Sequence, residues 1–357
     1  MDNMKIKIGV FFGGKSVEHE VSIISAIQAI NYIDKEKYDV IPVYITREND
    51  LYIGQDIDKI EEYKNIENLL RKSKKVILFS NNSKVQLIEM RRIGNKVCSE
   101  LDIAFPIVHG TNVEDGALQG YFKTLNLPFV GCDVTASALG MDKYAMKTVL
   151  KDNNIPVLEC KCFTFKQYNE DEEEVIKVIE EKFNYPVIVK PINLGSSVGI
   201  KIGKNKEELI EALEYAFQYA KKILVEEAIT NLKEINCSVL GDYEEAIASE
   251  LEEPINTDEI LSYKDKYIGG EKSGASKGMQ TLKRKLPAEI SDETKREIQE
   301  MAVSTFKILG CNGISRIDFM IDQNKNKVYV NEINTIPRII SILFMECIRN
   351  KIYGIIR

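Results

Sequence analysis

The sequence lacks features that would point to a membrane or a nucleic acid. No apolar run approaches the length that crosses a bilayer, and the apolar stretch Lys5–Phe12 meets Gly13 at once, which favours a strand over a signal peptide. The formal net charge is -7, so we expect no basic stripe that could bind the phosphate backbone of a nucleic acid. We therefore expect a cytoplasmic protein with no membrane partner and no nucleic-acid partner.

Cysteine is present but not in a pattern that indicates disulfides or zinc. The seven cysteines are odd in number and scattered, and Cys160 and Cys162 are too close in sequence for the usual zinc site. We interpret them as buried or free thiols in a reducing compartment.

A chain of 357 residues with 44% hydrophobic residues is long enough for two or three domains. It begins with a pattern typical of a βαβ unit in a parallel sheet: a strand over 6–12, a helix with apolar Val21, Ile24, Ile27 and Ile30, and a strand over 40–45. Further predicted elements are strands over 103–108, 186–190, 198–202, 223–227, 234–241 and 244–250, helices over 206–221 and 291–310, and helices that begin near 142 and within 170–174.

A long segment from Glu252 to Lys285 is rich in Gly, Ser and Lys. Loops of this length inside a compact domain are usually lids or binding segments. We predict a loop of that kind here.

Two apolar strands near the C-terminus carry oxygen ligands. Asp318 lies on the first strand, Glu332 and Asn334 lie two residues apart on the second, and a polar hairpin turn joins the strands. Oxygen ligands of this kind suit Mg²⁺ that bridges nucleotide phosphates, and carboxylates among apolar neighbours need a partner. The sequence therefore favours a metal site over the alternative of a polar edge hairpin.

A second chemical signal follows the strand over 186–190. Lys190 ends that strand and is followed by the glycine- and serine-rich segment Gly195–Gly199. Backbone N–H groups of such a loop can cradle phosphates, although the spacing is not that of a Walker A loop and the segment could be a plain turn.

At this point the chain resembles the ATP-grasp superfamily and, within it, the D-alanine–D-alanine ligases. The resemblance runs from residue 5 to Pro337 and rests on the order and spacing of seven motifs. These are Phe12–Ser22, His109–Gly120, Met141–Lys143, Val189–Pro191, Gly195–Gly199, Arg316–Asp318 and Asn331–Pro337.

The resemblance implies an α/β fold (α+β overall), in which an ATP-grasp fold is preceded by an N-terminal domain with a Rossmann-like parallel sheet. Residues 1–131 would form that N-terminal substrate domain and 132–226 a central ATP-grasp subdomain. Residues 227–357 would form a C-terminal ATP-grasp subdomain with a lid loop over 252–285.

The family's reaction joins two D-alanines through a D-alanyl phosphate, at the expense of ATP, for peptidoglycan precursors. By resemblance, Glu18 holds the ammonium group of the first D-alanine, His109 lies near its carboxylate, and Ser196 lies between loop and substrate. Arg316 matches the arginine that stabilises the developing oxyanion. The alternatives are an acid favourable at a helix N-terminus for Glu18, a strand-end turn residue for His109, and a cross-strand salt bridge to Asp318 for Arg316.

The resemblance also implies two Mg²⁺ or Mn²⁺ ions on Asp318, Glu332 and Asn334, catalytic roles for Glu18, Ser196, Tyr267 and Arg316, and a homodimer. Tyr267 and Lys266 match the lid that closes over the site and excludes water, and their alternative is an ordinary surface loop. The residues that the resemblance places at ATP are Lys143, Lys190, Ser196, Ser197, Glu226, Glu227, Glu234 and Lys266.

The sequence departs from the family's pattern at two places. Val113 stands where the family usually has glycine, so valine would impose strain or a changed loop if the position needs a positive φ. From Arg338 to Arg357 the sequence does not continue as Gly-Ser-Leu-Ala-Phe-Tyr-Leu-Trp, but AT-rich codons read one nucleotide later permit that continuation. Our hypothesis is that residues 338–357 are translated out of frame.

Three other functions stay open at this stage. One is a sister ligase that joins D-alanine to D-serine or D-lactate. The second is a nucleotide-binding protein whose altered C-terminus impairs catalysis. An ATP-grasp ligase for unrelated acids is disfavoured by the motifs around Glu18 and His109.

Overall fold

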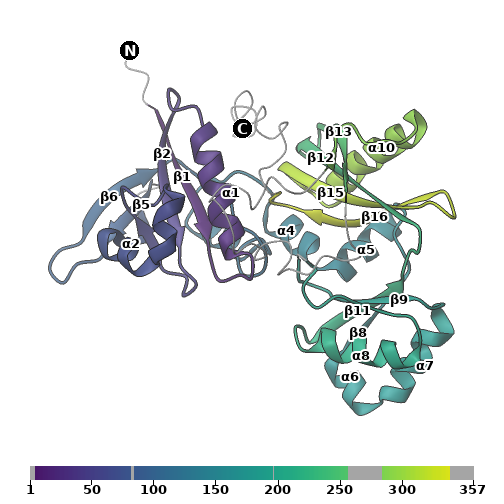
Figure 1. Ribbon diagram of the computed structural model, residues 1–357. Helices are drawn as coiled ribbons and strands as arrows, with labels where there is room; N and C mark the ends of the chain where they lie inside the picture. Colours follow the sequence, from purple (N-terminus) through teal and green to yellow (C-terminus); the bar gives the residue numbers. More distant parts are fainter. Residues whose placement is uncertain (1–4, 82–83, 196, 256–283, 338–357) are drawn as a thin grey trace.

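The computed structural model describes residues 5–81, 84–195, 197–255 and 284–337, which form three β-sheets with helices packed against them (Figure 1). Ser196, the lid residues Lys266 and Tyr267, and the segment from Arg338 lie outside the described residues. In the part of the chain that is described, no helix is long and apolar enough to cross a membrane.

The N-terminal sheet has seven strands in the order β6-β5-β4-β3-β2-β1-β7. Its strands are β1 (Ile6–Gly13), β2 (Tyr38–Ile45), β3 (Leu51–Ile53), β4 (Lys74–Asn81), β5 (Lys84–Glu89), β6 (Lys96–Leu101) and β7 (Ile103–Pro106). Helix α1 (His19–Tyr32) connects β1 to β2, which pair in parallel, so the predicted βαβ unit is confirmed. The helix buries Ile23 rather than the predicted Ile24 together with Val21, Ile27 and Ile30.

This sheet is mixed, whereas the sequence indicated a parallel one. Strand β1 pairs in parallel with β2 and β7, but β3 to β6 extend the sheet through antiparallel pairs. Strand β1 reads as a continuous apolar run because both of its faces are covered. Ile8 and Val10 belong to the core cluster against α1, and Phe11 belongs to the cluster on the opposite face. Shorter helices in this part are η1 (Ile60–Asn65), α2 (Ile66–Lys72) and α3 (Ala117–Thr124).

The central sheet is antiparallel, in the order β10-β9-β11-β8. Its strands are β8 (Cys160–Thr164), β9 (Val187–Pro191), β10 (Lys201–Gly203) and β11 (Lys222–Glu227), and its helices are α6 (Phe165–Glu170), α7 (Glu172–Lys182) and α8 (Lys206–Phe217). Helix α7 begins in the predicted acidic stretch, with Asp171 as N-cap. Strand β10 begins later than predicted because Ser197 (φ 60°) and Gly199 (φ 75°) have left-handed backbones that a strand excludes.

The C-terminal sheet is also antiparallel, in the order β14-β13-β12-β15-β16. Its strands are β12 (Leu232–Gly241), β13 (Ala246–Pro254), β14 (Arg284–Lys285), β15 (Gly313–Asp322) and β16 (Lys327–Asn334). The helices α4 (Val134–Met141), α5 (Lys143–Asp152) and α10 (Asp292–Ile308) share one apolar core with it. The predicted loop 252–285 is shorter than expected at both ends, because β13 continues to Pro254 and β14 pairs with it.

Candidate active site

The four polar residues predicted on the last two strands lie on one face of the β15–β16 pair. In the register of the pair, Arg316 is opposite Asn334 and Asp318 is opposite Glu332. Arg316 donates from Nε to Oδ1 of Asp318 (2.6 Å) and from Nη2 to Oδ2 (2.7 Å). Asn334 donates from Nδ2 to Oδ2 of Asp318 (3.1 Å). The ion pair considered as the alternative for Arg316 is therefore formed, but within β15 and not across strands.

Burial and neighbouring charges affect the two carboxyl groups differently. Burial raises the pKa of Asp318, and the attraction of Arg316 only partly offsets this effect. Burial acts in the same direction on Glu332, but Lys143 outweighs it and the pKa of Glu332 is lowered. Two carboxylates and an amide oxygen are a donor set that fits Mg²⁺ or Mn²⁺. Within the described ranges, no group of three or more His, Cys, Asp or Glu side chains could hold a metal ion. The predicted set has only two such side chains, and the amide of Asn334 would be its third ligand.

Lys143 connects strand β16 to the glycine-serine loop. It is the first residue of α5, where Asp142 is the N-cap. Its Nζ lies 3.1 Å from Oε2 of Glu332 and donates to the carbonyl oxygen of Leu194 (2.9 Å). One ammonium group therefore contacts both the strand and the loop that were predicted to face the phosphates.

Gly140 brings helix α4 directly against β16. A Cβ added to Gly140 would lie 2.7 Å from Cγ2 of Thr335 and 3.1 Å from Cγ2 of Ile333. Any side chain at this position would push the helix away from the strand. The absence of a side chain therefore helps to hold Lys143, three residues later, within reach of Glu332.

A second charged group lies deeper in the protein and includes a residue that the sequence analysis missed. Glu226 is fully buried, and its two carboxylate oxygens accept hydrogen bonds from the ammonium groups of Lys147 and Lys190. Burial alone would raise the pKa of Glu226, but the two lysines outweigh it and lower the pKa to about 2. Lys147 lies one helical turn after Lys143 on the same face of α5, and that spacing is the signal that could have identified it.

Not all of the described residues that were predicted to bind the nucleotide belong to this charged group. Lys190 and Glu226 are, and Lys190 also lies 3.5 Å from Oδ1 of Asn331. Glu227 ends β11 and forms an ion pair with Lys325 (3.7 Å), and Glu234 lies on β12 opposite Met320. The contacts of these acids with a nucleotide stay a prediction.

The N-terminal sheet contributes Glu18 and the loop that follows β7. Glu18 is the buried N-cap residue of α1. A Cβ added to Gly110 or to Gly195 would lie 3.2 Å from Oε2 of Glu18. The structure therefore brings the carboxylate of Glu18, the loop that begins at His109 and the glycine-serine loop together at one place.

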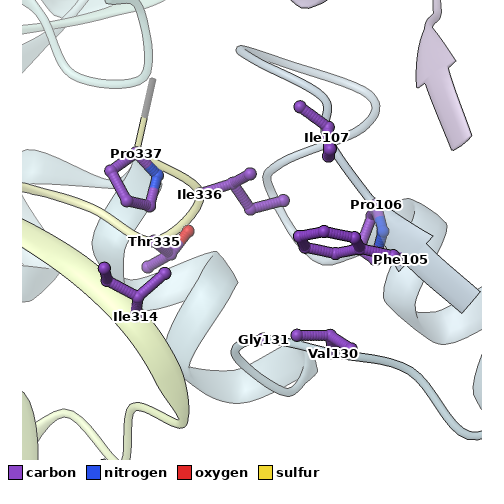
Figure 2. Close-up of a pocket in the computed structure, with 9 residues that line it drawn as sticks. All are labelled: Phe105, Pro106, Ile107, Val130, Gly131, Ile314, Thr335, Ile336 and Pro337. Atoms are coloured by element: carbon purple, nitrogen blue, oxygen red, sulfur yellow. The ribbon is translucent and has the colours of Figure 1, made fainter. Parts of the chain in front are cut away.

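His109 is buried and contacts both helix α1 and the segment that follows β16. Its Nδ1 lies 3.1 Å from the carbonyl oxygen of Ile336, and its Nε2 lies 3.2 Å from Oγ of Ser25. Because a carbonyl oxygen only accepts, Nδ1 must carry the proton. Below Ile336 lies an apolar cavity (Figure 2) lined by Phe105–Ile107, Val130–Gly131, Ile314 and Thr335–Pro337.

The strain that valine at position 113 could have caused is not found. The residues of this loop with positive φ are Gly110, Asn112 (φ 66°) and Gly116, and not Val113. Glycine and asparagine tolerate that conformation. Val113 is buried in the core cluster behind β1. A Cβ added to Gly14 would lie 2.5 Å from Cγ1 of Val113, so the valine packs directly against the glycine turn after β1.

Comparisons with known proteins show the family to which the chain is similar. The family model for the D-ala D-ala ligase N-terminus matches residues 7–132, and the model for the D-ala D-ala ligase C-terminus matches residues 149–351. The second match continues past Pro337, so it does not itself mark a break at Arg338.

Individual relatives match over nearly the whole chain. A D-alanine–D-alanine ligase from Acetivibrio thermocellus is 41% identical, with 95% of this chain and 89% of that protein covered. Among solved structures, the VanG D-Ala:D-Ser ligase from Enterococcus faecalis has a TM-score of 0.78 and 35% identity, with 95% of this chain and 92% of that chain covered. The D-alanine–D-alanine ligase from Coxiella burnetii has a TM-score of 0.76 and 31% identity, with coverages of 95% and 86%.

These matches confirm the predicted fold class, an ATP-grasp fold preceded by an N-terminal domain whose sheet includes parallel strands. They also extend over both parts of the chain that contribute to the site. The chain belongs to the D-alanine–D-alanine ligase family.

Proposed function

We propose that this protein joins two D-alanines into D-alanyl-D-alanine for peptidoglycan precursors. A carboxylate oxygen of the first D-alanine attacks the γ-phosphorus of ATP, which gives an acyl phosphate and ADP. The amine nitrogen of the second D-alanine then attacks the acyl carbon, loses a proton and expels phosphate. One observation carries the proposal. Glu18 lies beside both Gly110 and Gly195, the first residue of the glycine-serine loop. The residue before that loop, Leu194, contacts Lys143, which lies beside Glu332.

The residues have distinct roles in this scheme. Glu18 holds the ammonium group of the first D-alanine, and His109 contributes to the pocket for its carboxylate. Lys143 and Lys190 bind phosphates as point charges. Arg316 stabilises the negative charge that develops during transfer, a type of donor whose loss costs about 2.7–4 kcal/mol.

Asp318, Glu332 and Asn334 would hold two Mg²⁺ or Mn²⁺ ions. Bound to nucleotide phosphates, such ions neutralise their charge and orient the γ-phosphoryl group. We keep Ser196, Tyr267 and Lys266 as predicted contributors from outside the described residues, and Ser197, Glu226, Glu227 and Glu234 as predicted nucleotide contacts.

A second candidate function has a specific observation in its favour. The 35% identity to a D-Ala:D-Ser ligase is close to the identity with D-alanine–D-alanine ligases, so D-serine is the first alternative for the second substrate. D-Lactate is the further alternative of the same class.

The test is product analysis by mass spectrometry. Purified protein is incubated with ATP, Mg²⁺ and D-alanine, alone or with D-serine or D-lactate. We expect D-alanyl-D-alanine as the main product and ADP in equal amount. If the main product instead joins D-alanine to D-serine or D-lactate, that compound is the second substrate. ADP without any condensed product would count against the ligase reaction.

The same assay addresses the tail. A matched protein in which 338–357 follow the shifted reading frame is measured beside the chain as it stands. Nucleotide binding by both, with dipeptide from the restored protein alone, would support the impaired, nucleotide-binding alternative. Equal activity of both would remove the tail from consideration, and gene resequencing checks the frame directly.

We also propose the division into residues 1–131, 132–226 and 227–357, a homodimer and a cytoplasmic location. Light scattering coupled to size exclusion measures the assembly state. A monomer at working concentration would contradict the dimer.

A further inference from the structure

The loop after β7 binds both backbone polar groups of a single residue, Ile336. The amide nitrogen of Ile336 donates to Oε1 of Glu114 (3.1 Å), and its carbonyl oxygen lies 3.1 Å from Nδ1 of His109. The partners are 222 and 227 residues apart in sequence. Ile336 lies two residues after the end of β16, the strand that carries Glu332 and Asn334.

Glu114 also stabilises the loop from which it comes. Its Oε2 accepts a hydrogen bond from the amide nitrogen of Gly110 (2.9 Å). Glu114 is buried at 8% exposure, so its carboxylate has little access to water and needs hydrogen-bond donors such as these. One oxygen of the carboxylate therefore holds the start of the loop, and the other holds the segment that follows β16.

The position of Gly110 matters because it lies beside Glu18. A Cβ on Gly110 would be 3.2 Å from Oε2 of Glu18 and 2.3 Å from Oγ of Ser16, so this backbone forms one wall of the Glu18 site. Movement of the loop would change that wall. The contacts of Lys143 with Glu332 and Leu194 do not involve Glu114 and should be kept.

We infer that Glu114 is a positioning residue that holds the first amino-acid site in register with the metal-ligand strand. It acts through Gly110 and Ile336 and does not itself touch the reacting atoms. The inference rests on the proposed function for its link to amino-acid binding. The hydrogen-bond bridge itself does not depend on that function.

The test is Glu114→Gln, which has nearly the same shape but only one acceptor oxygen. One of the two N–H groups then faces an NH₂ donor and loses its partner. We expect the KM for the first D-alanine to rise at least about tenfold, the loss typical of a hydrogen bond to a charged group. The dissociation constant of the nucleotide should stay within about twofold, since the lysine contacts are separate. A variant that is only less stable would lose kcat in proportion to unfolded protein, with KM unchanged.

Asp115→Asn is the matched control. Asp115 is the next residue and accepts hydrogen bonds from the amide nitrogens of Asn112 in the loop (2.7 Å) and of Ala117 at the start of α3 (3.2 Å). Its substitution should leave the KM for D-alanine near the native value. If Glu114→Gln fails to fold, Glu114→Asp replaces it, because the shorter side chain cannot reach both donors.

Hydrogen–deuterium exchange at the amides of Gly110 and Ile336 gives a readout that needs no activity. Exchange at one of these two amides should be faster in Glu114→Gln than in the native protein, and exchange at both should be unchanged in Asp115→Asn. Unchanged exchange at both amides in Glu114→Gln would overturn the bridge, and faster exchange with an unchanged KM would overturn its role in positioning. If the native protein makes no dipeptide but exchange responds as expected, the proposed function fails while the bridge stands.

Discussion

Two charged groups lie next to each other in this protein and are built in opposite ways. In the buried triad of Lys147, Glu226 and Lys190, both oxygens of the single carboxylate are bound by ammonium groups, and Glu226 is 0% exposed. On the β15–β16 face, the carboxylates of Asp318 and Glu332 face each other, and Glu332 keeps 29% of its side chain exposed.

The difference indicates that the two groups have different roles, one in structure and one in binding. Both oxygens of the triad's carboxylate are already bound by ammonium groups, so the triad contributes to the structure around Lys190. The β15–β16 face has two acids, one amide and partial access, which is what a metal-bound nucleotide needs. We therefore expect substitutions in the triad to affect folding first, and substitutions on the face to affect binding and turnover first.

The largest effect should follow from Glu226→Gln. The substitution leaves two buried ammonium groups without a carboxylate, and breaking a buried pair in this way typically destabilises a protein by about 3–5 kcal/mol. Urea denaturation measures the change in the free energy of unfolding. Glu211→Gln, in the exposed pair with Lys201, is the control and should leave the free energy of unfolding nearly unchanged. Similar values for the two variants would contradict a structural role for the triad.

The pH dependence of that difference should follow the pKa of Glu226. Because the folded pKa is about 2 and the ordinary value is 4.5, the ionised carboxylate stabilises the fold fully above pH 4.5, and this contribution is lost as the pH falls toward 2. The gap in unfolding free energy between the native protein and Glu226→Gln should therefore narrow across that window. Denaturation at several pH values measures it, and a constant gap would show that the charge of Glu226 is not what stabilises the fold.

On the β15–β16 face, Arg316→Lys should reduce kcat by about 10²–10³-fold, the range for a lost oxyanion donor. Lysine keeps the charge beside Asp318 but cannot form the two parallel hydrogen bonds of the guanidinium group. Stability should change little. Steady-state rates of dipeptide formation test this, with the dissociation constant of ATP as control, and a native kcat would assign Arg316 to structure alone.

Asp318→Asn should have the smallest effect on the fold and a selective effect on the metal. We expect the Mg²⁺ concentration needed for half-maximal nucleotide binding to rise at least about 10–100-fold, since even outer partners of metal ligands have effects of that size. A titration with a fluorescent ATP analogue measures it. An unchanged Mg²⁺ requirement would exclude Asp318 as a ligand.

The arrangement of residues on the β15–β16 face could be predicted from the sequence because it depends only on two strands that are neighbours in the chain. Two apolar strands with a short polar turn between them leave little choice of register, and alternation then places Asp318 and Glu332 on one face. The helix start at Asp142 and the acidic start of α7 were equally local signals, since capping depends on neighbours in sequence.

Other parts could not be predicted because they depend on distant partners. Strand β4 buries Val76 and Leu78 but exposes the equally apolar Ile77 and Phe79, so its sequence does not show which face is buried, and its place in the sheet is set by pairing. Lys147 meets Glu226 across 79 residues, and Glu114 meets Ile336 across 222. No periodicity in a single segment shows which distant acid and base will be buried together.

The close packing of Gly140 against β16 has a consequence for motion. With no side chain at Gly140, the clearance between α4 and Thr335 is smaller than one methyl group. Sliding of α4 along β16 would bring these atoms into contact, so we expect the two elements to move together. Because Lys143 begins the helix that follows α4, we also expect it to stay beside Glu332 when substrates enter.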